Sequence, residues 1–115
     1  MVIKITRKRS TPNFTEGTVT VNGEYLCDSL EFTKSMMAEG LYDLNRRSRP
    51  FCHGNAWREM PRDGLQNRIM VGERIIPGVV LRSRPHYDHI VERMRKSQTP
   101  IVLIITSAEG NIHCL

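Results

Sequence analysis

The sequence has little cysteine, few aromatic residues and no long hydrophobic run. Its three cysteines, Cys27, Cys52 and Cys114, include no CxxC pair, which argues against a disulfide framework and against a zinc site. The longest aliphatic run, residues 101–105, is far too short to span a bilayer, and the first residues lack the continuous apolar core of a secretory signal. We therefore expect a cytoplasmic protein with reduced thiols and no membrane span, with export by a partner or a lysis pore as the alternative.

Several motifs of common enzymes are also missing. The chain contains no glycine-rich phosphate loop, no serine-nucleophile motif and no pair of carboxylates placed for acid–base work. His86 and His89 are three residues apart and would share a helix face, but no cluster of acids or cysteines nearby completes a metal site. We expect neither a metal nor a cofactor.

Positive charge, in contrast, is abundant and unevenly distributed. The formal net charge is +5, and 13 of the 17 basic residues are arginines. Nine of those arginines lie between residues 46 and 84, a stretch with only three acids. Guanidinium groups bind carboxylates and phosphates through two parallel hydrogen bonds, so this excess indicates an anionic partner. The other interpretation, which we favour from the sequence, is a solvated surface on which the arginine stems cover apolar area.

Short strands separated by turns dominate the local pattern. Alternating or continuous apolar residues predict strands at 2–7, 18–21, 24–30, 40–44, 68–71, 101–106 and 112–115. Asn22-Gly23 predicts a type I′ hairpin turn, because both central residues of that turn need a positive φ. Residues 83–96 predict one helix, capped by Ser83. The apolar face of that helix would consist of Tyr87, Ile90, Val91 and Met94.

Residues 45–66 show no sustained period and contain two prolines and two glycines, which is typical of a long functional loop. The chain is long enough for one small core and not for two. We therefore predict a single domain over residues 1–115, mainly β with one α-helix in its C-terminal half. Its sheet would be a small mixed or antiparallel sheet, or a partial barrel.

Four segments, in chain order, resemble a family of small uncharacterised bacterial and phage-type proteins that looks like a reduced L,D-transpeptidase (YkuD-like) domain. The family's dGeylcdtLE hairpin corresponds to Asn22–Glu31, and its iPaGtYxv segment corresponds to Met37–Leu44. Its iHxGN segment corresponds to Phe51–Asn55, and its GCIxVG segment corresponds to Asn67–Gly72. The resemblance covers nearly the whole chain and implies an L,D-transpeptidase-like β scaffold.

The departures from this family fall on the catalytic positions. In L,D-transpeptidases a cysteine attacks a peptidoglycan stem peptide to form a thioester, and an upstream histidine assists it. Here Arg68 stands at the cysteine position and Cys52 at the histidine position, although an alignment shifted by one residue would put His53 there. A guanidinium stays protonated and cannot attack a carbonyl carbon.

The resemblance therefore implies a non-catalytic binding or accessory domain that keeps a cleft for a peptidoglycan peptide or another anionic ligand. The expected ligand-binding residues are Arg68, Asn55, Trp57, Arg58 and Tyr42, with Cys52 and His53 beside them. Trp57, the only tryptophan, would either stack on a ligand or pin the long loop to the core.

Two further hypotheses remain from the residues themselves. Cys52, next to His53 in an arginine-rich loop, is the candidate nucleophile of a cysteine-dependent transpeptidase or hydrolase. Cysteine and histidine that are adjacent in sequence seldom face each other, which weighs against this. The arginine-rich stretch would alternatively bind nucleic acid with strong salt dependence, but the chain offers few aromatic side chains for stacking.

Overall fold

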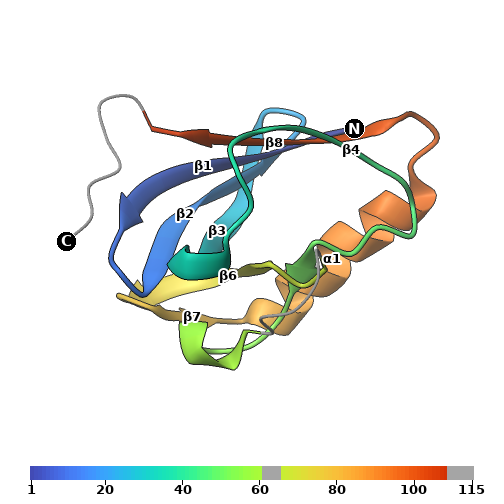
Figure 1. Cartoon of the computed structure of the whole chain (residues 1–115). Helices are drawn as coiled ribbons and strands as arrows, with labels where there is room; N and C mark the ends of the chain where they lie inside the picture. Colours follow the sequence, from blue (N-terminus) through green and yellow to red (C-terminus); the bar gives the residue numbers. More distant parts are fainter. Residues whose placement is uncertain (61–65, 109–115) are drawn as a thin grey trace.

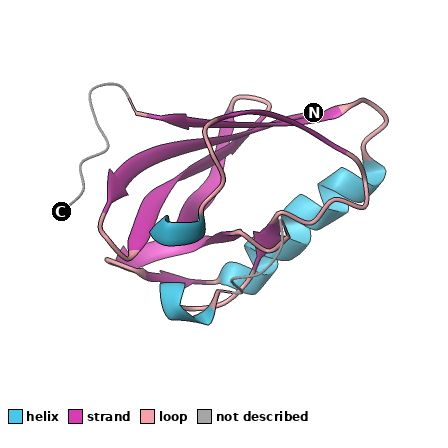
Figure 2. Cartoon of the chain, viewed as in Figure 1, coloured by secondary structure: helices cyan, strands magenta, loops and turns pink. Residues whose placement is uncertain are grey.

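The computed structural model describes residues 1–60 and 66–108, which form one open, mixed, eight-stranded sheet with a helix packed against it (Figures 1 and 2). The strands are β1 (Val2–Ser10), β2 (Phe14–Val21), β3 (Glu24–Phe32), β4 (Gly40–Leu44), β5 (Phe51–Cys52), β6 (Ile69–Ile76), β7 (Val79–Leu81) and β8 (Ile101–Ser107). The helices are α1 (Ser83–Lys96) and two 3-10 turns, η1 (Thr33–Ser35) and η2 (Trp57–Glu59). The prediction of a β-rich chain with one α-helix in its C-terminal half is confirmed.

The sheet order is β4-β8-β1-β2-β3-β6-β5, and β7 pairs separately with β6. Strands β1, β2 and β3 form an antiparallel meander, whereas β8 joins β1 in parallel, with Ile3 opposite Leu103. The predicted β2–β3 hairpin is confirmed, because Asn22 and Gly23 both have positive φ, at 51° and 85°. This order puts β4 at one edge of the sheet and β5 at the other.

The main core lies between the sheet and α1. It contains aliphatic residues from β1, β2, β6 and β8, and α1 contributes Ile90 and Met94, which are fully buried. Figure 1 shows α1 running beneath the sheet. The predicted apolar helix face is confirmed, since Val91 is also buried and Tyr87 packs against the core edge. A second, smaller cluster on the opposite face of β3 and β6 contains Leu30 and Met70.

Two local predictions are wrong. Ser83 does not cap α1, because the N-cap residue is Arg82 in the left-handed region. The Ser83 hydroxyl instead donates a hydrogen bond to the Val71 carbonyl and accepts one from the Gly54 N–H at 3.1 Å. The stretch 45–66 is not wholly irregular, because it contains β5, which pairs in parallel with β6. The predicted strand at 112–115, with Cys114, lies outside the described residues.

Candidate functional site

Cys52 and His53 have different surroundings, and only Cys52 belongs to β5. Cys52 packs in the smaller cluster, whereas its neighbour Phe51 is buried in the main core. His53 is exposed and contacts the ring of Tyr87 on α1 edge to face, with ring centroids 5.1 Å apart. The imidazole therefore lies against α1 whereas the thiol packs in the smaller cluster, an arrangement that does not favour proton transfer between them.

Cys52 also lacks the electrostatic setting of a nucleophile. Burial raises the pKa of its thiol from 9.0 to about 12. No neighbouring cation offsets that effect, although arginines surround this position in the sequence. Reactive thiols in proteins have lowered pKa values and some exposure. The arrangement therefore favours an inert core thiol.

We expect thiol-reactive probes to leave Cys52 almost unlabelled in the folded protein. At about pH 8 it holds about a thousandfold less thiolate than an exposed cysteine, so labelling should be slower by at least that factor. Peptide-resolved mass spectrometry with and without urea measures this, and Cys27 is a matched control because burial also raises its pKa to about 12. Labelling of folded Cys52 as fast as in urea would restore the cysteine-enzyme hypothesis.

The same two thiols predict a loss of stability in alkali. An unfolded chain releases their protons near pH 9.0, whereas the folded chain holds them to about pH 12. The folded state therefore binds more protons in this window, and the free energy of unfolding should fall as the pH rises through it. Urea titrations at several alkaline pH values measure this slope. A Cys27→Ala variant should flatten it.

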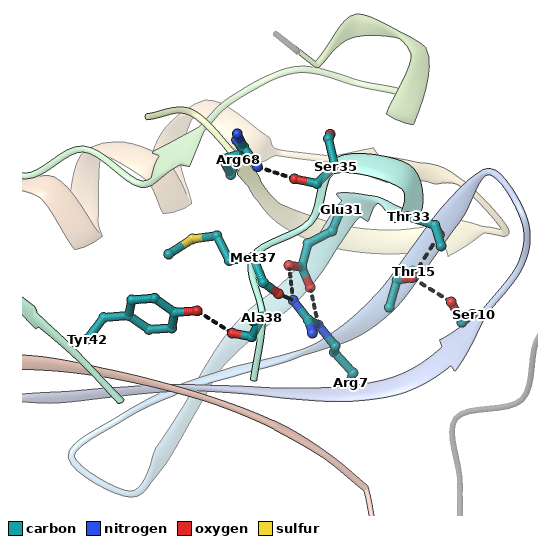
Figure 3. A network of polar contacts seen from close by, with 10 residues as sticks. All are labelled: Arg7, Ser10, Thr15, Glu31, Thr33, Ser35, Met37, Ala38, Tyr42 and Arg68. Carbon is teal, nitrogen blue, oxygen red and sulfur yellow. Dashed lines mark hydrogen bonds and ion pairs between the residues drawn. The ribbon is translucent and has the colours of Figure 1, made fainter. Parts of the chain in front are cut away.

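Arg68 and Tyr42 both form hydrogen bonds to backbone carbonyls, Arg68 at the end of η1 and Tyr42 in the segment between η1 and β4. The Arg68 guanidinium donates to the Ser35 carbonyl, and the Tyr42 hydroxyl donates to the Ala38 carbonyl. Figure 3 shows the Arg68 and Tyr42 side chains reaching these two carbonyls from different sides, with Met37, whose carbonyl accepts from Arg7, between Ser35 and Ala38. Tyr42 lies on the edge strand β4, far along the strand order from β5. These two predicted ligand-binding residues therefore form structural hydrogen bonds, Arg68 to Ser35 and Tyr42 to Ala38.

Trp57 pins the loop, as one of its two predicted roles requires. Its indole stacks on Phe32 with centroids 5.7 Å apart and planes 6° apart, and it also contacts Phe14. Its backbone N–H donates to the Gly78 carbonyl at 3.2 Å. The Arg58 guanidinium lies over the outer side of the indole, 5.4 Å from its centroid. This aromatic cluster closes the smaller core where η2 meets β3 and the β6–β7 turn.

Asn55 is exposed, and its backbone is fixed. Its N–H donates to the Glu59 carboxylate at 2.9 Å, and its carbonyl accepts from Val80 at 2.9 Å. The predicted site residues therefore have different surroundings. The Cys52 thiol is buried, and Arg68 and Tyr42 bond backbone carbonyls. Trp57 packs on Phe32, whereas His53, Asn55 and Arg58 are exposed. The strand order separates Tyr42, on β4 at one edge of the sheet, from Cys52, on β5 at the other edge.

A buried ion pair was missed by the sequence reading. Arg7 and Glu31 are 2% and 0% exposed, and their side chains meet through two hydrogen bonds of 3.0 and 2.7 Å (Figure 3). Arg7 also donates to the Met37 carbonyl at 2.6 Å. Burial raises the pKa of Glu31, and the guanidinium opposes that rise. The alternation of Ile3 and Ile5 continues to Arg7, which was the available indication that Arg7 faces inward.

Three surface hollows of the described chain are candidate ligand sites, and none is lined by Cys52, His53 or Arg68. One, the arginine hollow, has a volume of about 520 Å³ and lies between the end of β4 and the start of β8. Its lining consists of Leu44, Asn45, Arg46, Arg47, Ser97, Gln98, Thr99, Pro100 and Ile101. Two of these nine residues are arginines and none is acidic.

The two arginines of this hollow keep hydrogen-bonding capacity. Arg46 donates through Nε to the Ser97 carbonyl at 2.8 Å, which fixes the guanidinium at the rim. Its terminal nitrogens, and the whole Arg47 guanidinium, make no hydrogen bond or ion pair to residues 1–60 or 66–108. Arg47 is exposed, and its N–H bond to the Asn45 side chain at 2.8 Å orders the backbone beneath it. A preorganised guanidinium with open donors suits a carboxylate or phosphate.

The neighbouring helix hollow, of about 840 Å³, shares Ser97, Gln98 and Thr99 with the arginine hollow. Its charges are mixed and largely paired: Asp88 bonds Arg84 at 3.0 Å, and Glu92 bonds Lys96 at 3.1 Å. It therefore provides a polar extension of the arginine hollow more than a second centre of positive charge.

A polar cluster at the start of α1 uses one of the predicted surface histidines. Glu73 on β6 accepts from Arg82 at 2.9 Å and contacts His86 Nε2 at 2.9 Å. Arg82 first, and His86 second, hold the pKa of Glu73 at about 2. In residues 1–60 and 66–108, no three His, Cys, Asp or Glu side chains are grouped as they would be to hold a metal.

Comparison of the chain with protein-family models, curated protein sequences and solved structures gives no match. The resemblance to L,D-transpeptidases stays a prediction. Within the described residues, no helix has the length and apolar character needed to cross a bilayer.

Proposed function

We propose that this chain is a non-catalytic binding domain whose ligand carries a carboxylate, and that the arginine hollow receives it. The observation that carries the proposal is the lining of that hollow, which has two arginines with open donors and no acid. Ligand sites combine an apolar lining with a few polar groups that fix orientation. Leu44, Pro100 and Ile101 supply the apolar part, and the Asn45 and Gln98 amides can pair with peptide groups.

The absence of catalysis in this proposal follows from the two candidate nucleophile positions. Burial raises the pKa of the Cys52 thiol to about 12, and Arg68 is hydrogen-bonded to Ser35. Neither group can attack a carbonyl carbon at neutral pH. The resemblance to L,D-transpeptidases makes a peptidoglycan stem peptide the first ligand to test, because it ends in a carboxylate and carries small apolar side chains.

The test is a titration of the ¹⁵N-labelled protein with a synthetic stem peptide and with the same peptide bearing a C-terminal amide. We expect amide shifts at residues 44–47, 97–99 and 101, and at least about tenfold weaker binding of the amidated peptide. Arg47→Ala should weaken binding of the free acid by about tenfold. Arg95→Ala removes the same charge from an exposed helix position outside the hollow and is the matched control.

Other outcomes discriminate between the hypotheses. Shifts confined to residues 52–58 and 68 would place the ligand at the residues expected from the family resemblance and would contradict the arginine hollow. Equal affinity for the free-acid peptide and the amidated peptide would show that the protein does not recognise the terminal carboxylate, and would contradict the proposal. Tighter binding of an oligonucleotide than of the peptide, with steep salt dependence, would favour the nucleic-acid hypothesis.

A further inference from the structure

The tip of the β6–β7 hairpin exposes two adjacent isoleucines. Ile75 is 55% exposed and Ile76 is 56% exposed, just before the Pro77-Gly78 turn. Six large hydrophobic residues are exposed in the described chain, and only these two are consecutive. A single exposed aliphatic residue is ordinary on a protein surface, whereas a contiguous apolar projection indicates an interaction site.

Three cations surround this tip. Lys8, Arg9 and Arg74 line a hollow of about 290 Å³ together with Ile75, Ile76, Pro77 and Glu16. Figure 1 shows the reason, since the β6–β7 turn lies beside the end of β1 and the start of β2. None of the three side chains forms an ion pair with a residue in 1–60 or 66–108. Their charge is therefore directed to solvent.

The single acid in this hollow does not present its charge to a ligand. Glu16 is 3% exposed, and its Oε2 accepts a hydrogen bond from the Gly78 N–H at 2.9 Å. That bond fixes the hairpin turn from below. Gly78 has a positive φ, and a side chain at this position would crowd the Trp57 and Phe14 rings, so the turn requires glycine here. The hairpin tip therefore has an apolar end, formed by Ile75 and Ile76, and three basic residues around it, Lys8, Arg9 and Arg74, here called the basic collar.

We propose that this end of the molecule docks on an anionic phospholipid surface. Ile75 and Ile76 enter the boundary between headgroups and acyl chains, and Lys8, Arg9 and Arg74 lie at the level of the lipid phosphates. Apolar insertion combined with basic residues is the chemistry that holds peripheral proteins on membranes. Each basic residue near such a surface strengthens partition about fivefold, and the interaction weakens with salt.

The observations favour lipid over a nucleic acid or a folded partner. A nucleic acid offers no apolar phase for two aliphatic side chains, and isoleucine gives it neither stacking nor hydrogen bonds. A protein partner would need a larger apolar patch than two side chains provide. A bilayer accepts a narrow projecting tip without shape complementarity. Its negatively charged phosphates can pair with the basic side chains of the collar.

The experiment is co-sedimentation of the full chain with vesicles of phosphatidylcholine alone and of phosphatidylcholine with phosphatidylserine. We expect binding to the anionic vesicles only, with a partition coefficient near that of a single acyl chain, about 10⁴ M⁻¹. Ile75→Ser/Ile76→Ser should lower it at least about tenfold at unchanged charge. Lys8→Gln/Arg9→Gln should lower it by about twenty-fivefold and reduce its salt dependence.

Two controls separate this proposal from the others. Leu41→Ser removes a 72% exposed aliphatic residue from β4 and should leave vesicle binding unchanged. Arg46→Ala/Arg47→Ala should keep vesicle binding within about twofold while weakening peptide binding. The membrane proposal and the peptide-binding proposal can therefore be contradicted separately. No binding to anionic vesicles overturns the proposal. Equal binding by the isoleucine variant, or tighter binding to an oligonucleotide than to vesicles, also overturns it.

Discussion

Replacing Arg7 with alanine should lower the free energy of unfolding by about 3–5 kcal/mol. The variant leaves the Glu31 carboxylate, which is 0% exposed, without its two guanidinium hydrogen bonds. It also removes the hydrogen bond from Arg7 to the Met37 carbonyl, which joins the segment after η1 to β1. A small domain has about 5–15 kcal/mol in total, so much of the stability depends on this contact. Urea denaturation followed by circular dichroism measures the loss.

A double variant separates the ion pair from the packing around it. Arg7→Met/Glu31→Leu removes both charges and keeps the volume, so it should recover most of the stability lost by Arg7→Ala. Arg9→Ala is the control, because Arg9 is exposed two residues further along β1 and should change stability by less than about 0.5 kcal/mol. A loss below about 1 kcal/mol for Arg7→Ala would contradict a buried, solvent-excluded pair.

Replacing Trp57 with alanine should lower the free energy of unfolding by about 3 kcal/mol. The change removes the stack on Phe32 and the contact with Phe14, and it opens the smaller core above Leu30. The β6–β7 turn should loosen as well, because Gly78 packs against the indole. Thermal and urea unfolding measure the loss, and hydrogen exchange at Val80 reports on the turn.

Trp57→Phe is the conservative variant for this site. It keeps an aromatic face against Phe32 and should cost less than about 1.5 kcal/mol. A ligand-stacking role makes the opposite prediction, since Trp57→Ala would then leave stability intact and abolish peptide binding. Because Trp57 is the only tryptophan, its fluorescence follows unfolding and peptide binding in the unsubstituted chain, and circular dichroism and the peptide titration follow them in the two variants.

Local rules were enough for much of the scaffold. Asn22-Gly23 specifies its hairpin through the φ values that the turn requires, and the spacing of Ile90 and Met94 specifies the buried face of α1. Both features depend on residues that are close in the sequence, adjacent in the hairpin turn and four positions apart in the helix. The two-residue strand β5 was missed, because it exists only through pairing with Ile69 and Met70.

The site was harder to predict because side-chain partners lie far apart in the sequence. Ser83 has a residue type that caps helices, yet its hydroxyl binds Val71 and Gly54 from two other strands or loops. Arginine density predicted an anionic partner but not which arginines are open. Arg68 bonds Ser35, whereas Arg47 remains exposed, and only the packing of distant segments decides between them.

The parallel pairing of β1 with β8 has a kinetic consequence. The first strand cannot complete the sheet until residues 101–107 are available to pair with it, so the fold depends on contacts of long sequence separation, which slow folding. During synthesis, β1 presents an unpaired edge, and Ile3 and Ile5 lack their neighbour Leu103. Unpaired edges and uncovered apolar residues are what chaperones and aggregation act on. The nascent chain therefore passes through a vulnerable interval that ends only when β8 leaves the ribosome.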